Sequence, residues 1–125
     1  MKLDRDCVRD FLLALESLEP GENLTSSNYH SKPQLASYNR DVIIYTAEKL
    51  DEAGFINVKF MPVLSGDKPF IATSLTWHGH QFLDNIRDDG VWKETKKVAS
   101  KVASVSLNIL ADIAASIMKR TLGLE

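Results

Sequence analysis

Two runs rich in β-branched, aromatic and other apolar residues lie in the middle of the chain, from Val58 to Leu64 and from Phe70 to Trp77. The residues between them, Ser65-Gly66-Asp67-Lys68-Pro69, are of the types that form tight turns. Two such runs around a turn that contains glycine predict a β-hairpin. The segments on both sides of the hairpin have helical or loop patterns.

A first helix is predicted from Asp4 to Leu18. Its apolar residues recur at spacings of three and four, which places them on one face: Val8, Phe11, Leu12, Leu15 and Leu18. Asp4 is the expected N-cap, because its carboxylate can accept from free backbone N–H groups. Glu19-Pro20-Gly21 ends the helix, and the polar residues 21–34 are predicted to form a loop.

A second helix is predicted from Leu35 to Ala53, with Gly54 as its C-terminal stop. At about 100° per residue, one face collects the residues expected to be buried, which are Leu35, Ala36, Ile43, Ala47, Leu50 and Ala53. The helix leads directly into the hairpin.

Helical patterns return after the hairpin. Thr76 is the expected cap of a third helix, whose buried face holds Phe82, Leu83 and Ile86. Asp88-Asp89-Gly90 marks a break, and the chain is predicted to be helical from Val91 to about Leu122, with an interruption near residues 104–106.

The order of predicted elements resembles a winged helix, in which two helices precede a hairpin that forms the wing. The predicted fold class is therefore α+β. We expect a winged-helix-like domain over residues 1–92 and a C-terminal helical extension over residues 93–125. The extension would pack on the domain or serve for self-association.

Composition fits a cytoplasmic protein with one core. A chain of 125 residues with 44% hydrophobic residues can bury such a core, and the net charge of −2 provides no general attraction to nucleic acid or anionic membranes. Residues 1–6 are charged where a signal peptide would begin its apolar region. The single cysteine, Cys7, excludes an internal disulfide and is expected to be a packed apolar side chain instead of an activated thiolate.

Three segments, MKLDRDCVRDFLLALE, LDEAGFI and LTWHGHQFLDNIRDDGVWKETK, resemble a family of uncharacterised small proteins from Firmicutes and their prophages. The family is filed as a domain of unknown function, and its fold is similar to the YjcQ-like winged helix. The resemblance covers nearly the whole chain, and its most specific part is the run LTW-x-GH-x-FLDNIRDD-x-VW. It implies a winged-helix fold, a bacterial or phage cytoplasm, and no known catalytic residues.

His78-Gly79-His80 and the aspartates that follow could belong to a metal or acid–base site, or to a structural joint. Residues two apart on a helix point about 200° apart, so His78 and His80 cannot both face one ion without distortion. Asp84 and Asp88 share a helix face but lack a companion Glu-x-x-His motif. We favour the joint, in which Gly79 allows close backbone approach and both tryptophans, at 77 and 92, cover the edge of the core.

Motifs for catalysis are absent from the sequence. It contains no G-x-S-x-G, P-loop, G-x-G-x-x-G, H-E-x-x-H or C-x-x-C. We therefore expect a protein that is not an enzyme and that uses no metal or cofactor.

The outward face of the second helix is the predicted contact for a protein partner. It combines acids with aromatic and apolar side chains that could anchor an interface, namely Tyr38, Asp41, Ile44, Tyr45, Glu48 and Glu52. The expected function is that of a phage- or prophage-associated regulatory binding module.

DNA-binding transcriptional control is the alternative. Its candidate residues are Asn39 and Arg40 at the start of the helix, Lys68 in the hairpin turn, and a strip of lysines at Lys93, Lys97 and Lys101. Phosphate contacts need basic residues, and the acidic face of the helix works against them. We therefore rank a protein partner first.

The C-terminal helix is the candidate for self-association. It is too apolar to remain fully exposed in a monomer, and its residues Val105, Ile109, Ile113 and Ile117 recur at a spacing of four. It would either fold back on the domain or pair with a second copy to form a homodimer.

Overall fold

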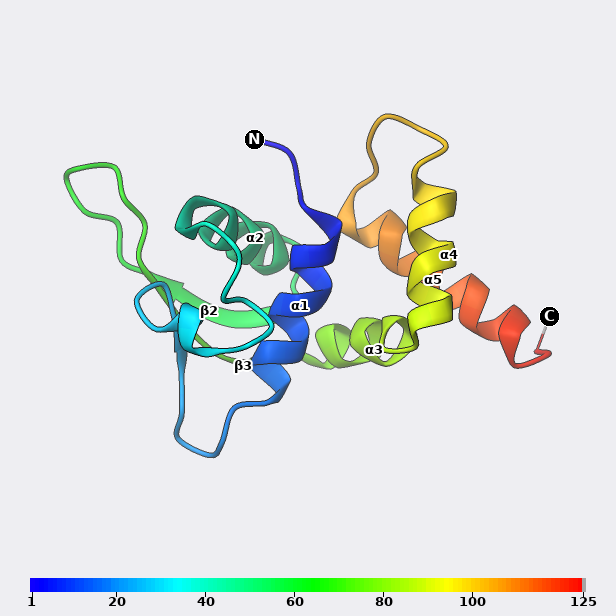
Figure 1. The fold of residues 1–125 in the computed structure, drawn as a ribbon, viewed down its shortest axis with the longest axis horizontal. Coiled ribbons are helices and arrows are strands. Elements are labelled where there is room, and N and C mark those ends of the chain that lie inside the picture. The colour runs from blue at the N-terminus through cyan, green and yellow to red at the C-terminus, as the bar shows by residue number, and fades with distance from the viewer. Residues whose placement is uncertain (125) are drawn as a thin grey trace. The chain divides into compact units, whose positions relative to one another are not determined.

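The structure is a computed structural model that describes residues 1–124. It is an α+β protein with five α-helices, one short 3-10 helix and a three-stranded antiparallel sheet in the described residues (Figure 1). The chain divides into two compact units, residues 1–79 and the residues from His80 onward. The division that we expected after residue 92 falls inside a helix of the second unit.

Helix α1 (Arg5–Glu16) matches its prediction and is capped as expected. The Asp4 carboxylate accepts a hydrogen bond from the backbone N–H of Cys7 at 3.0 Å, which satisfies one of the free donors of the first turn. The predicted apolar face is buried at Val8, Phe11, Leu12 and Leu15.

Helix α2 (Arg40–Glu52) begins five residues later than predicted. Residues 33–37 form turns after the short 3-10 helix η1 (Tyr29–Ser31). Asn39 then has an extended backbone, which separates these turns from α2. Leu35 is still fully buried, so its apolar character reflects a place in the core and not a helical face. Gly54 ends α2 with a φ of 78°, as expected for a C-terminal glycine.

The predicted hairpin consists of β2 (Ile56–Phe60) and β3 (Phe70–Leu75), joined by the hairpin loop of residues 61–69. A third strand, β1 (Leu24–Thr25), pairs with the other edge of β3, so the strand order is β1-β3-β2. A bulge lies between Asn57 and Val58. Figure 1 shows the hairpin loop projecting beyond the strands.

The core of the first unit lies between the helices and the sheet. α1 contacts both α2 and β3, and α2 also contacts β2. Phe70 lies at the centre, with its ring 5.9 Å from that of Phe11 and 6.1 Å from that of Phe60. Burial of such apolar side chains is the main source of stability, at about 1.5–3 kcal/mol for each.

The second unit continues α3 (Trp77–Ile86) and contains α4 (Asp89–Ala99) and α5 (Leu107–Thr121). The breaks before α4 and α5 lie where the sequence predicted them. Asp88 caps α4 through the N–H of Val91, and Ser106 caps α5 through the N–H of Ile109. α5 packs against α4 with a buried face formed by Leu107, Leu110, Ala114 and Ile117. Within residues 1–124, no helix is both long and apolar enough to cross a membrane.

Candidate functional site

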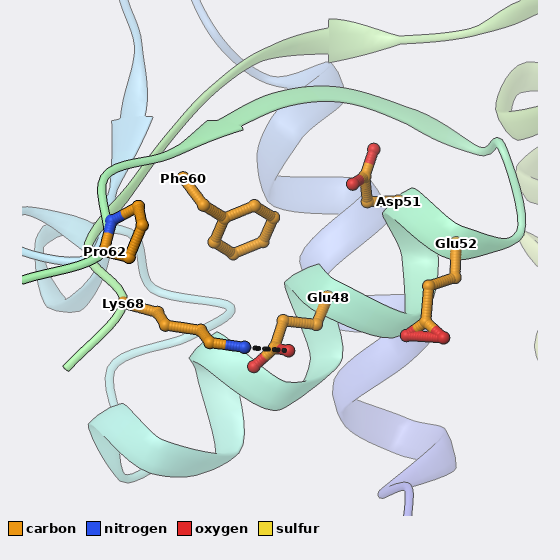
Figure 2. Close-up of a pocket in the computed structure, with 6 residues that line it drawn as sticks. All are labelled: Glu48, Asp51, Glu52, Phe60, Pro62 and Lys68. Atoms are coloured by element: carbon orange, nitrogen blue, oxygen red, sulfur yellow. Dashed lines mark hydrogen bonds and ion pairs between the residues drawn. The ribbon is translucent and has the colours of Figure 1, made fainter. Parts of the chain in front are cut away.

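A groove of about 360 Å³ lies between α2 and the hairpin. Three carboxylates of α2 line one side, and an aromatic ring, a proline and a lysine line the other: Glu48, Asp51, Glu52, Phe60, Pro62 and Lys68. Figure 2 shows the Phe60 ring between Pro62 and α2, while the Lys68 side chain reaches across to Glu48. We call this the α2–hairpin groove.

A second hollow of about 310 Å³ adjoins the α2–hairpin groove. Glu48 and Lys68 line both, so the ion pair between them lies where the two hollows meet. The remaining lining residues come from α2, the hairpin loop and the start of the chain: Met1, Asp41, Ile44, Tyr45, Gly66 and Asp67.

Two ion pairs connect α2 to the hairpin loop. Arg40 Nη1 lies 2.7 Å from Asp67 Oδ1, and Lys68 Nζ lies 3.3 Å from Glu48 Oε2. The hydrogen bond from Arg40 lowers the pKa of the Asp67 carboxyl, and the same bond raises the pKa of the Arg40 guanidinium. These side chains are partly solvated, so each pair adds little stability. Their main effect is to position the loop against the helix.

This face has an excess of negative charge. α2 and the hairpin loop contain five acids (Asp41, Glu48, Asp51, Glu52 and Asp67) and three bases (Arg40, Lys49 and Lys68), a net charge of −2. Lys49 Nζ lies 3.1 Å from Glu52 Oε2. Together with the pairs of Arg40 and Lys68, this means that each of the three bases is paired with one acid. Asp41 and Asp51 remain without an ion pair or side-chain hydrogen bond in the described residues.

The hairpin loop has an apolar half. Met61, Val63 and Leu64 are all exposed, and Leu64 is fully so. A cluster of exposed apolar side chains beside a groove is characteristic of a contact surface. We predicted strand through Leu64, but Pro62 cannot donate a ladder hydrogen bond, and β2 ends at Phe60. Pro62 was the sequence signal for this loop.

Five of the six residues predicted for the protein contact line the groove or its neighbouring hollow, namely Asp41, Ile44, Tyr45, Glu48 and Glu52. Ile44 is only 8% exposed, so its expected role as an exposed anchor is wrong. Tyr38 precedes α2, and its hydroxyl donates to Asp10 Oδ2 at 2.6 Å. It therefore connects this segment to α1. The sequence pattern did not indicate Asp51, which follows Glu48 by three positions on α2, or Phe60, which lies on β2 and not on the helix.

The residues considered for DNA lie in two places. Asn39 and Arg40 stand at the start of α2, and Lys68 lies in the hairpin loop, where Arg40 and Lys68 are both paired with acids. Lys93 and Lys97 are exposed on α4, and Lys101 follows the end of that helix. The three lysines make no ion pair within residues 1–124.

The histidine segment forms the predicted backbone joint. Thr76 Oγ1 accepts from the N–H of Gly79 at 3.1 Å and donates to the carbonyl oxygen of Gly54 at 2.6 Å. A Cβ at Gly79 would collide with the carbonyl oxygen of Phe55, the residue before β2. The expected close approach is therefore confirmed.

The two tryptophans of this region have different environments. Trp92 is buried, but Trp77 is 74% exposed, so the expectation that Trp77 covers the core is wrong. Trp77 is the first residue of α3, where its side chain points to solvent.

The acids and histidines of this region are surface or capping groups. His78 and His80 are exposed, Asp84 pairs with Arg87 at 3.3 Å, and Asp88 caps α4. Among the described residues, no three His, Cys, Asp or Glu side chains are arranged to hold a metal ion.

The residues proposed for self-association are divided between the core and the surface. Ile117 is buried and Ile113 is partly buried on α5. Val105 is partly buried before the helix, and Ile109 is 49% exposed. The surface that α5 leaves for a second chain is therefore smaller than the sequence pattern indicated.

Comparison with known proteins shows the family to which this chain belongs. A family model described as "Hypothetical protein (DUF2513)" matches residues 2–106. An uncharacterized protein of Haemophilus influenzae is 32% identical over 124 residues, which cover 98% of this chain and 99% of that protein. That organism is not among the Firmicutes, so similar proteins extend beyond the group that the sequence resemblance indicated. No solved structure matches the chain.

Proposed function

Because the chain belongs to the DUF2513 family, whose description names no activity, we propose from the α2–hairpin groove that it is a non-catalytic module that binds a protein partner. The resemblance to prophage proteins favours a regulatory role in a phage or prophage context. The descriptions of the family and of the Haemophilus influenzae relative name no activity or partner, so the proposal is based on the surface of this chain.

The topology of the first unit supports a winged-helix-like interpretation. Helix α1, strand β1, helix α2 and the β2–β3 hairpin follow one another in the order used by winged helices, and β1 pairs with β3. Turns and the short helix η1 occupy the segment where a further helix would lie. In this interpretation, the hairpin loop is the wing and α2 occupies the position of a recognition helix.

The exposed apolar half of the hairpin loop is the observation that favours a protein partner. Met61, Val63 and Leu64 stand beside a groove with an aromatic floor and a charged edge. Protein interfaces commonly have an apolar centre surrounded by polar residues. A DNA-binding face would instead present unpaired basic residues, whereas Arg40 and Lys68 are both neutralised by acids.

Site-specific photo-crosslinking in cells tests this proposal. A photoreactive amino acid placed at Leu64 should form a discrete adduct with one protein, to be identified by mass spectrometry. The same amino acid at Asp112, which is exposed on α5, provides the control. The identified protein should then bind the purified chain, and Leu64→Asp should weaken that binding. Adducts that are absent at Leu64 or identical at both positions would contradict the proposal.

DNA binding remains the second candidate, because Lys93, Lys97 and Lys101 are exposed and make no ion pair in the described residues. We expect no salt-sensitive binding of duplex DNA at micromolar protein. Steep loss of binding between low and moderate salt would reverse the ranking, since counterion release makes phosphate contacts salt-dependent. Loss of such binding in Arg40→Ala would assign it to α2, and loss in the triple lysine-to-alanine variant would assign it to α4.

A further inference from the structure

We infer that the occupant of the α2–hairpin groove is a basic segment of the partner protein, with an arginine side chain over Phe60 and an apolar side chain against the hairpin loop. This inference depends on the proposed function and specifies the chemistry of the partner. It is based on the lining of the groove, on its charge and on the position of Lys68.

The lining suits a long cationic side chain. Phe60 and Pro62 provide an apolar floor, and the carboxylates of Glu48, Asp51 and Glu52 lie along α2 (Figure 2). Arginine and lysine place their apolar stems on such surfaces while the charged head remains near solvent and acids. Arginine fits better than lysine, because its planar guanidinium stacks on aromatic rings and binds carboxylates through two hydrogen bonds.

The negative charge of α2 and the hairpin loop also favours a basic occupant. The net charge of −2 over α2 and the hairpin loop leaves Asp41 and Asp51 without ion pairs in the described residues. Lys59 does not offset it locally, because successive side chains of a strand point to opposite faces and Lys59 is adjacent to Phe60. Complementary charge steers a partner and rejects one of the wrong sign.

Lys68 already places a cation in the groove. Its side chain extends across the hollow to Glu48 at 3.3 Å, as Figure 2 shows. An arriving arginine would compete with Lys68 for that carboxylate. Whether removal of Lys68 raises or lowers the binding affinity therefore depends on the charge of the partner. A basic segment should bind more tightly without Lys68, whereas an acidic segment or nucleic acid should bind less tightly.

Fluorescence anisotropy with two synthetic peptides tests the inference. One peptide alternates arginine with leucine, and the other has glutamate in place of arginine. The wild-type chain should bind only the arginine peptide. Lys68→Gln should tighten binding by about two- to five-fold and Asp51→Asn should weaken it by a similar factor, in the range of a solvated ion pair.

Matched controls separate local from general charge effects. Lys59→Gln removes the same charge as Lys68→Gln from the opposite face of β2, and Asp112→Asn removes the same charge as Asp51→Asn from α5. Both controls should leave binding unchanged, and circular dichroism should show that every variant is folded. Leu64→Asp should also weaken binding of the arginine peptide.

Several outcomes would overturn the inference. These are tighter binding of the glutamate peptide, no binding of either peptide, weaker binding in Lys68→Gln, or equal effects in the controls. None of them affects the crosslinking result at Leu64, which tests the protein contact itself. A crosslinked partner whose contacting segment is acidic would preserve the proposed function and remove the basic occupant.

Discussion

Single residues determine how closely the backbone elements of the first unit approach one another. Gly79 lies in the first turn of α3, where its backbone rests on the backbone of Phe55. A Cβ at this position would meet the carbonyl oxygen of Phe55 and would lie 3.0 Å from its carbonyl carbon. Backbone atoms cannot rotate away as a side chain can, so only glycine fits at this position without moving one of the two segments.

Gly79→Ala is therefore expected to destabilise the protein, although alanine favours helices. Overpacking typically costs about 1–3 kcal/mol, and here it acts on backbone. Gly90→Ala is the matched control, because the added Cβ would meet one side-chain atom, Asp88 Oδ2 at 3.2 Å, and no backbone atom. Denaturant unfolding measures both variants. Equal stability of the two would show that α3 can shift away from Phe55 at little cost.

Cys7 is expected to be unreactive in the folded chain. It is fully buried, Thr46 Oγ1 lies 3.4 Å from its sulfur, and burial raises the pKa of the thiol to about 12. A thiol reagent should not modify the native protein at mildly alkaline pH but should modify one thiol per chain in denaturant. Rapid native modification would contradict the packed position.

The same pKa shift gives a pH dependence of stability with a definite sign. The folded pKa of about 12 exceeds the ordinary thiol pKa of 9.0, so the folded state holds this proton more tightly than the unfolded state. The contribution is complete below pH 9 and is lost as the pH rises toward 12. Cys7→Ala should lack this component of the loss, as unfolding at a series of alkaline pH values would show.

At the scale of elements, local sequence signals placed most boundaries. Asp4, Thr76, Asp88 and Ser106 begin helices through side-chain hydrogen bonds to nearby backbone, and such bonds depend only on residues three positions apart. The interruption between α4 and α5 and the end of α2 at Gly54 were also predictable, because they depend on residue types within a few positions in the sequence.

Predictions that needed tertiary context failed. The periodicity of apolar residues predicted a single buried face on α2. Because α2 contacts both α1 and β2, its buried surface is wider and includes Ile44. Asp41, Tyr45, Glu48 and Glu52 still line the groove or the hollow beside it, because polar side chains on the outer face of a helix remain accessible. The partners of Arg40 and Lys68 were not predictable, since the register between a helix and a hairpin loop has no local signature.

The cap of α4 provides a test at this scale that separates structure from chemistry in the aspartate cluster. Asp88 Oδ2 accepts from the N–H of Val91 at 2.9 Å, while Asp84 forms an exposed pair with Arg87. Asp88→Ala should reduce the free energy of unfolding by about 1 kcal/mol, as N-cap losses typically do. Asp84→Ala should change it by less than about 0.5 kcal/mol. Equal losses would mean that Asp84 has a structural partner beyond Arg87.

At the scale of the whole molecule, the C-terminal helix α5 is the element that the family match does not cover. The family model ends at residue 106, directly before α5, yet the alignment with the Haemophilus influenzae protein covers 98% of this chain and therefore extends over the residues that form α5 here. α5 uses Leu110 and Ile117 against the core of its own unit. Exposed apolar residues remain in or beside it, at Val102, Ile109, Leu122 and Leu124.

We expect this remaining surface to support weak self-association. Light scattering over a dilution series should give a mass above 14.0 kDa at high concentration that falls toward 14.0 kDa on dilution. The neighbouring residues Ile109 and Leu110 test the cause, because one is 49% exposed and the other is buried. Ile109→Asp should remain folded and monomeric, whereas Leu110→Asp should lose helical structure, since a buried charge without a partner is strongly unfavourable. A mass of 14.0 kDa at every concentration would instead assign α5 only to the core of its own chain.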